Sequence, residues 1–295
     1  MDGVLVVDKP EGITSHDVVT VARRCLREKR IGHTGTLDPM ATGVLPLACG
    51  RATRLVRFLT ASDKDYTATI RFGLTTDSYD ITGEETGRTD RRPTREAIEG
   101  ALAALRGEYL QMPPAFSAKK VGGTRAYALA RRDAPVDLKP APVRVARAEL
   151  TRFDGEEAIV ELTCSAGFYV RSFASDLGGR LGMGACLSAL RRTRSGEFGA
   201  EQAMTIQEMQ AGHAELRLVP LEQLLPLFPA VRLTDDGYVR VAHGREVDAP
   251  HVEIEGSSAI PTAEWVRLLT RDGRLVALAS PGSREGSLHP SLVLI

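Results

Sequence analysis

Residues 32–43 have the sequence GHTGTLDPMATG, and no sustained helical or strand periodicity runs through them. Three glycines surround one carboxylate, Asp38, and glycine permits close approach of the backbone to a ligand. Pro39 restricts Asp38 to an extended conformation and removes a neighbouring N–H donor, so the backbone sets the direction of the carboxylate. The segment therefore predicts an ordered loop that positions a carboxylate, although most Asp-Pro pairs in loops are simple turns. The residues alone leave the reaction open.

The segments on both sides of this loop predict an α+β fold. Apolar residues at helical spacing predict one helix that is capped by Ser15 and ends before Gly32, a second capped by Thr94, and a third over 170–181. Apolar runs and alternating patterns predict strands at 4–7, 66–72, 143–153 and 158–164, and a short strand or helix at 44–48. The Asp154-Gly155 pair between the last two is a strong hairpin signal.

The pattern changes after Pro229. Short strands are predicted at 231–233, 239–242, 265–270 and 275–279, and a loop is predicted at 252–264. We therefore expect a larger domain over 1–229, with a basic segment around 112–136, and a small β-rich domain over 230–295.

Composition places the chain among ordinary globular proteins, since 43% of its residues are hydrophobic and 26% are charged. No apolar run approaches the roughly 20 residues that span a bilayer. The N-terminus lacks the features of a secretory signal, so a cytoplasmic protein without a membrane association is expected. The four cysteines and six histidines show no ligand spacing, which favours buried thiols and predicts no metal site.

Charge is balanced over the whole chain, with 38 basic and 38 acidic residues. Locally, basic residues gather at 23–30, 117–132 and 191–194. Such clusters neutralise the phosphates of a nucleic acid, but they also occur on ordinary solvated faces. The segment 117–132 follows Pro113-Pro114, and we expect it to be a mobile element that closes on RNA.

Five motifs, in order, resemble those of the tRNA pseudouridine-55 synthases (the pseudouridine synthase II family), which modify a uridine of the T loop. The motifs are GVLVVDKPEGITS at 3–15, the segment 32–43, DYTA at 65–68 with FGLTTD at 72–77, QMPPAFSA at 111–118, and CSAGFYVR at 164–171. The resemblance covers residues 1–195, and the C-terminal segment matches the family's small RNA-binding domain only loosely.

The resemblance implies a mixed or antiparallel-sheet pseudouridine synthase core with a small C-terminal PUA-like domain. It implies that the protein converts uridine 55 in the tRNA T stem-loop to pseudouridine after flipping the base. It further implies a monomer that needs no cofactor, no metal and no protein partner. An additional role in tRNA folding is a related hypothesis.

The same resemblance implies roles for individual residues. Asp38 corresponds to the catalytic aspartate, Tyr66 to the tyrosine that stacks on the flipped base, and Arg171 to the arginine that pairs with the aspartate. His33 corresponds to a histidine that holds the T loop. The further residues that we expect to contact substrate are Lys9, Lys119, Lys120, Arg125 and Tyr169.

The proposed isomerisation breaks the bond from C1′ to N1, turns the uracil and rejoins it through C5. A carboxylate beside C1′ can stabilise a positive sugar or bond to it, an arginine keeps that carboxylate ionised, and an aromatic ring retains the free uracil. Attack at C1′, addition to the uracil ring, and proton loss from the sugar all remain open. Two other functions also remain open, namely a nucleosidase or base glycosylase and an RNA-binding protein without catalysis.

Overall fold

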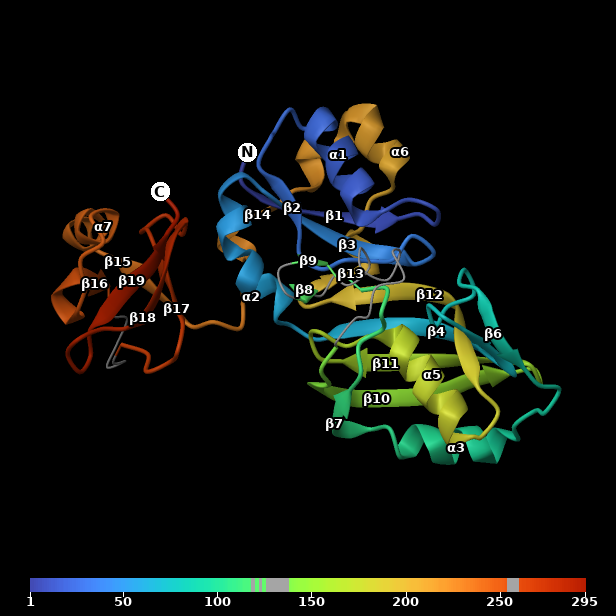
Figure 1. The fold of residues 1–295 in the computed structure, drawn as a ribbon. Coiled ribbons are helices and arrows are strands. Elements are labelled where there is room, and N and C mark those ends of the chain that lie inside the picture. The colour runs from blue at the N-terminus through green and yellow to red at the C-terminus, as the bar shows by residue number, and fades with distance from the viewer. Residues whose placement is uncertain (118–119, 122–123, 126–137, 254–259) are drawn as a thin grey trace.

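The computed structural model describes residues 1–117, 138–253 and 260–295, and the backbone of 120–121 and 124–125. A ten-stranded sheet forms its larger part, with the strand order β14-β1-β3-β12-β4-β11-β10-β7, β2 beside β3, and β13 beside β12 (Figure 1). The strands are β1 Gly3–Lys9, β2 Ile31–His33, β3 Thr42–Cys49, β4 Lys64–Phe72, β7 Gly107–Gln111, β10 Ala141–Phe153, β11 Glu157–Cys164, β12 Ala185–Ser195, β13 Phe198–Gly199 and β14 Val219–Pro220.

This sheet is mixed, as expected. Its paired strands are antiparallel except β3 and β12, which run parallel where Arg192 lies opposite Gly43. The hairpin of β10 and β11 and the alternating strand β4 confirm the predictions made for 143–164 and 66–72. Two smaller antiparallel pairs accompany the sheet, β5 Leu74–Thr76 with β6 Glu85–Arg88 and β8 Lys120–Val121 with β9 Thr124–Arg125.

The helices are α1 Ser15–Cys25, α2 Val56–Thr60, α3 Arg95–Ala103, α5 Val170–Arg180, α6 Ile206–Glu208 and α7 Asp235–Ala242. Figure 1 shows α1 and α6 beside the β1 end of the sheet, and α3 and α5 beside the β10 end. Thr94 caps α3 as predicted. The cap of α1 is Thr14 rather than Ser15, because Thr14 and Asp17 form a reciprocal capping box and Ser15 is turned inward. In the part of the chain that the structure describes, none of the helices combines the length and apolar character of a membrane-spanning segment.

A second sheet has the order β16-β15-β17-β18-β19. Its strands are β15 Ala230–Leu233, β16 Val252–Glu253, β17 Val266–Leu269, β18 Leu275–Pro281 and β19 Leu288–Val293. The strand predicted at 239–242 is wrong, since these residues end α7. Thr234 caps that helix, and Asp235 and Asp236 lie in its first turn, where the helix dipole favours negative charge.

The two sheets share an apolar cluster. Val4, Val6 and Leu55 from the larger part pack in one buried group with Leu275, Leu278 and Leu294 from the second sheet. At its edge, Phe58 meets Trp265 in a T-shaped contact with ring centroids 4.8 Å apart. This contact joins α2 to the residue that precedes β17.

The cluster of arginines at 191–194 does not form a free basic surface. Arg191 and Arg194 pair with Asp8 and Asp65 at 2.8 Å and 2.6 Å, and Arg192 is buried. These residues lie in β12, a strand that the sequence pattern did not predict because its arginines interrupt the apolar alternation.

Candidate active site

A cavity of about 220 Å³ opens where the loop before β3, the first residues of β4, β12 and the start of α5 meet. These elements come from four separate parts of the chain. The cavity is lined by Gly35, Thr36, Leu37, Asp38, Thr60, Lys64, Tyr66, Ser117, Ser165, Gly167, Phe168, Tyr169, Val170, Arg171, Leu190 and Arg192.

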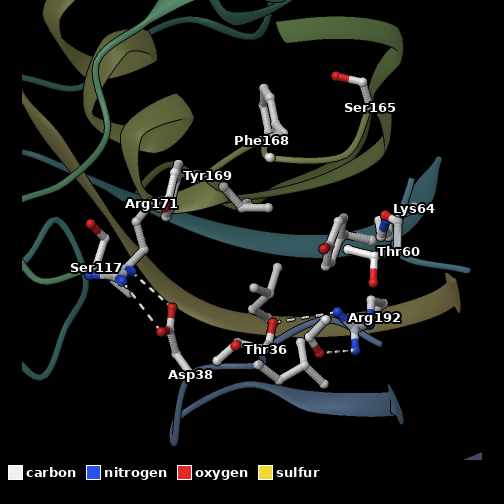
Figure 2. A pocket seen from close by; sticks show the side chains of 16 residues that line it. Thr36, Asp38, Thr60, Lys64, Ser117, Ser165, Phe168, Tyr169, Arg171 and Arg192 are labelled. Carbon is white, nitrogen blue, oxygen red and sulfur yellow. Dashed lines mark hydrogen bonds and ion pairs between the residues drawn. The ribbon is translucent and has the colours of Figure 1, made fainter. Parts of the chain in front are cut away.

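Asp38 and Arg171 form an ion pair at one end of this cavity (Figure 2). The guanidinium reaches both carboxylate oxygens, with Nε 2.9 Å from Oδ2 and Nη2 3.3 Å from Oδ1. The Arg171 side chain is 6% exposed, whereas that of Asp38 is 37% exposed. The arginine is therefore fixed inside the protein, and the carboxylate faces the cavity in a set direction.

A second carboxylate, Asp80, holds Arg171 from behind. Its Oδ2 lies 3.6 Å from Nη1 of Arg171, and its side chain is 7% exposed. Its Oδ1 accepts hydrogen bonds from the backbone N–H of Thr82 at 3.0 Å and from the hydroxyl of Ser78 at 3.0 Å. Asp80 is not predicted from the sequence, because it follows β5 in a turn without periodicity and pairs with a residue far along the chain.

Side chains from α1 and β1 hydrogen-bond to the backbone of the loop that carries Asp38. The Ser15 hydroxyl both accepts from the Leu37 N–H at 2.8 Å and donates to the Leu37 carbonyl at 3.0 Å. Lys9 donates its ammonium hydrogens to the carbonyls of Ile13 and Pro39, at 2.8 Å and 3.2 Å, and to that of Pro10. Both side chains act on the loop backbone rather than on the cavity.

The position of Lys9 differs from the one predicted for a substrate-binding residue. Its side chain is wholly buried, and it is not among the residues that line the cavity. Burial lowers the pKa of Lys9 to about 8. Its three hydrogen bonds use all the hydrogens of the ammonium group, and the one to Pro39 ties the Asp38 loop to the turn after β1.

Gly43 ends the loop in a conformation that only glycine adopts without strain, with φ at +101°. A Cβ atom there would lie 2.2 Å from the carbonyl oxygen of Arg192. The close parallel pairing of β3 with β12 therefore depends on the missing side chain, and it brings the loop and the Arg192 side chain together.

Tyr66 and Leu190 also line the cavity. The Tyr66 side chain is buried, and burial raises the pKa of its hydroxyl, an effect that the adjacent Arg192 guanidinium partly opposes. Tyr169 lines the cavity as well, and its backbone is held by the amide of Gln111, which accepts from the Tyr169 N–H at 2.8 Å. The structure thus brings together four of the predicted residues, Asp38, Tyr66, Tyr169 and Arg171.

The other predicted residues are His33, Lys119, Lys120 and Arg125. His33 ends β2 and is not among the cavity-lining residues. The side chains of Lys120 and Arg125, whose backbones pair in β8 and β9, and the whole of Lys119 lie outside the described residues. The expectation that the segment 117–132 closes on RNA also falls largely outside them.

No cysteine is among the residues that line the cavity. Burial raises the pKa of Cys49 and of Cys164 to about 12, and that of Cys186 to about 11. Among the residues that the structure describes, no three His, Cys, Asp or Glu side chains are arranged to hold a metal ion. Asp38 is thus the carboxylate in position to act on a molecule in this cavity.

Comparison with known proteins identifies the class to which this fold and site belong. A family model described as "TruB family pseudouridylate synthase (N terminal domain)" matches residues 23–170. A second, described as "tRNA pseudouridylate synthase B C-terminal domain", matches residues 171–226. The chain belongs to the TruB family of pseudouridylate synthases, which confirms the resemblance seen in the motifs.

Individual relatives agree with this assignment over their whole length. The tRNA pseudouridine synthase B of Solibacter usitatus is 46% identical and covers 100% of both chains. That of Thermobifida fusca is 43% identical over 99% of this chain and 98% of its own. Among solved structures, a chain of the archaeal box H/ACA sRNP Nop10–Cbf5 complex superposes with a TM-score of 0.75 at 26% identity, covering 99% of this chain and 86% of that one.

Proposed function

We propose that this protein isomerises uridine to pseudouridine in tRNA, at uridine 55 of the T loop, with Asp38 as its catalytic carboxylate. The observation that carries the proposal is the ion pair of Asp38 and Arg171 at the edge of a cavity that Tyr66 and Tyr169 also line. Family membership and the full-length relatives named tRNA pseudouridine synthase B support the choice of reaction and of RNA.

The residues of the cavity have complementary roles in this proposal. Asp38 meets the positive charge that develops at C1′ when the bond to N1 breaks, either as an ion or by bonding to that carbon. Arg171 keeps Asp38 ionised and aimed. Tyr66 supports the detached uracil while it turns so that C5 replaces N1, and Tyr169 covers the ring from the other side.

A uridine inside a folded loop reaches such a cavity only after it is flipped out of its stack, which costs a few kcal/mol. We propose that His33 helps to hold the opened T loop, and that Lys119, Lys120 and Arg125 contact its phosphates. Residues 1–229 would then form the catalytic domain and 230–295 a small RNA-binding domain. The protein is proposed to act in the cytoplasm as a monomer without a cofactor or protein partner, and its help in tRNA folding remains a prediction.

The test is tritium release from unmodified tRNA that carries 5-tritiated uridine, compared between the wild type and Asp38→Asn. The wild type should release about one equivalent per tRNA and no free uracil, because C5 loses its hydrogen when it bonds to C1′. Asp38→Asn should reduce the rate by at least about 10³-fold while the protein still binds tRNA.

Asp8→Asn is the matched control, since Asp8 also pairs with an arginine, Arg191, but lies outside the cavity. It should retain the wild-type rate. Release of free uracil would instead identify a glycosylase, and binding without any tritium release would identify a non-catalytic RNA-binding protein.

A further inference from the structure

The cavity has two ends of different charge. At one end, Asp38 and Arg171 neutralise each other. At the other end lie two cationic side chains, Lys64 and Arg192, with Thr60 beside them (Figure 2). Neither cation has a role in the proposed mechanism, and Lys64 is not among the site residues predicted from the sequence.

Lys64 is buried, with 6% of its surface exposed, yet it lines the cavity. Its ammonium group donates to the carbonyl of Thr60 at 2.5 Å and also to that of Ser62. A lysine has three hydrogens to donate, and these two bonds leave one for a molecule in the cavity.

Arg192 is more deeply buried, at 2% exposure. It donates to the carbonyls of Val44 at 2.7 Å and Gly35 at 3.2 Å. Within the described part of the chain, no carboxylate oxygen lies within 4 Å of Lys64 or Arg192. The nearest acidic residues in the sequence, Asp63 and Asp65, are paired with Arg144 and Arg194 instead.

Two buried cations without a carboxylate partner are costly to the folded protein. Burial, with a further contribution from Arg192, lowers the pKa of Lys64 to about 8. An anion bound between these side chains and Tyr66 would relieve that cost. This end of the cavity is therefore suited to negative charge.

The pairing of β4 with β12 places the Lys64 end of the cavity next to Tyr66, on which we propose the uracil rests. Lys64 and Tyr66 are two residues apart on β4, so their side chains emerge on the same face. Arg192 lies directly opposite Tyr66 in the pairing of β12 with β4. A uracil ring resting on Tyr66, with its sugar at Asp38, directs its far edge toward Lys64.

We propose that Lys64, supported by Arg192, stabilises the uracil anion formed when the glycosidic bond breaks. This inference rests on the proposed function. The bonding electron pair leaves C1′ with N1, and Asp38 meets the positive carbon. The negative charge of the ring spreads over N1 and the two carbonyl oxygens, one of which accepts a hydrogen bond from Lys64. C5 then attacks C1′, and the Tyr66 hydroxyl accepts the C5 proton while N1 takes up a proton, so the product has the atoms and charge of the substrate.

The experiment compares single-turnover rates for tRNA that contains uridine and for tRNA that contains 5-fluorouridine at the target position. Fluorine stabilises the leaving anion, so the enzyme needs less help from a cation. Lys64→Gln keeps two donors for the Thr60 and Ser62 carbonyls but removes the charge. It should slow cleavage of the uridine substrate about 100-fold and that of the 5-fluorouridine substrate about 10-fold or less, with tRNA affinity nearly unchanged.

Two controls accompany this comparison. Lys64→Arg retains the charge and should keep the wild-type ratio of the two rates. Arg57→Gln removes an exposed cation of α2 that does not line the cavity, and it should weaken tRNA binding at most, without changing the ratio. An equal loss of rate for both substrates in Lys64→Gln would overturn the inference, since a merely structural defect acts on both alike.

A second measurement needs no variant. Barbiturate is a pyrimidine of similar shape to uracil that is anionic at neutral pH, and it should inhibit the wild-type enzyme at a lower concentration than neutral uracil does. Equal inhibition by the two would contradict an anion-binding end of the cavity. If the wild type makes no pseudouridine at all, the proposed function fails; if it does so but these comparisons show no difference, only the role of Lys64 fails.

Discussion

Arg171 lies between two carboxylates, and only one of them faces the cavity. Asp38 is the exposed partner, whereas Asp80 lies behind the guanidinium and is itself held by Ser78 and Thr82. Because an arginine held by two partners keeps less freedom of movement than one held by a single partner, Asp80 positions the pair that we propose to be catalytic.

Replacing Asp80 by Asn should therefore slow pseudouridine formation about 10- to 100-fold, by loosening Arg171 and with it the aim of Asp38. Single-turnover tritium release measures this effect. Asp77→Asn is a suitable control, because Asp77 accepts a backbone N–H from Glu84 and lies on the exposed side of the same turn. Equal rates in the two variants would show that Asp80 does not position Arg171 and Asp38 for the reaction.

Activity should decline as the pH rises through about 8. Burial and Arg192 lower the pKa of Lys64 from 10.5 to about 8, while Cys164 and Asp63 oppose this shift only weakly. The cation is therefore present below pH 8 and lost above it. In Lys64→Arg the decline should move to a higher pH, because an arginine keeps its charge at every pH at which a lysine loses its proton. A decline that stays near pH 8 in this variant would point to Lys9, whose pKa is also about 8.

At the scale of elements, the site depends on the parallel contact between β3 and β12. Gly43→Ala should cost about 3 kcal/mol or more, because its Cβ would lie 2.2 Å from the Arg192 carbonyl oxygen and its φ is +101°. Activity should fall as well, since the Asp38 loop and Arg192 would move apart. Chemical denaturation and tritium release measure the two effects.

Gly12→Ala separates the clash from the backbone strain. Gly12 also has a positive φ, +87°, but nothing lies within 4 Å of the position that a Cβ atom would take there. This variant should lose only about 1–2 kcal/mol. Equal destabilisation of the two variants would show that strain alone, and not the contact with β12, decides the need for glycine at position 43.

At the scale of the whole molecule, the shared apolar cluster should make the two sheets unfold together. Leu278 is fully buried in that cluster, whereas Leu268 is fully buried in the core of the second sheet alone. Truncation of either residue to Ala should lower the free energy of unfolding by about 2–5 kcal/mol. Scanning calorimetry should record one transition in the wild type and in both variants. Two separate transitions in the wild type would contradict this coupling.

Much of the local structure could be predicted from the sequence. The alternation in β4, the hairpin turn at Asp154-Gly155 and the cap at Thr94 depend on interactions within a few residues, so their patterns are visible in one segment. The strand wrongly predicted at 239–242 shows the limit of this reasoning. The four residues at 239–242 are apolar or basic and are compatible with either a strand or a helix. They are helical in the structure because the helix that begins after the cap at Thr234 continues through them.

The sequence by itself determined that Asp38 sits in a glycine-rich loop and that the chain carries the motifs of its family, because both are properties of consecutive residues. Only the tertiary structure decided which side chains share the cavity. Arg171 reaches Asp38 across 133 residues, Lys9 turns inward beneath the loop, and Lys64 joins Arg192 at the far end. Such partners are set by strand register and helix packing, which bring distant segments together and leave no periodic trace in either one.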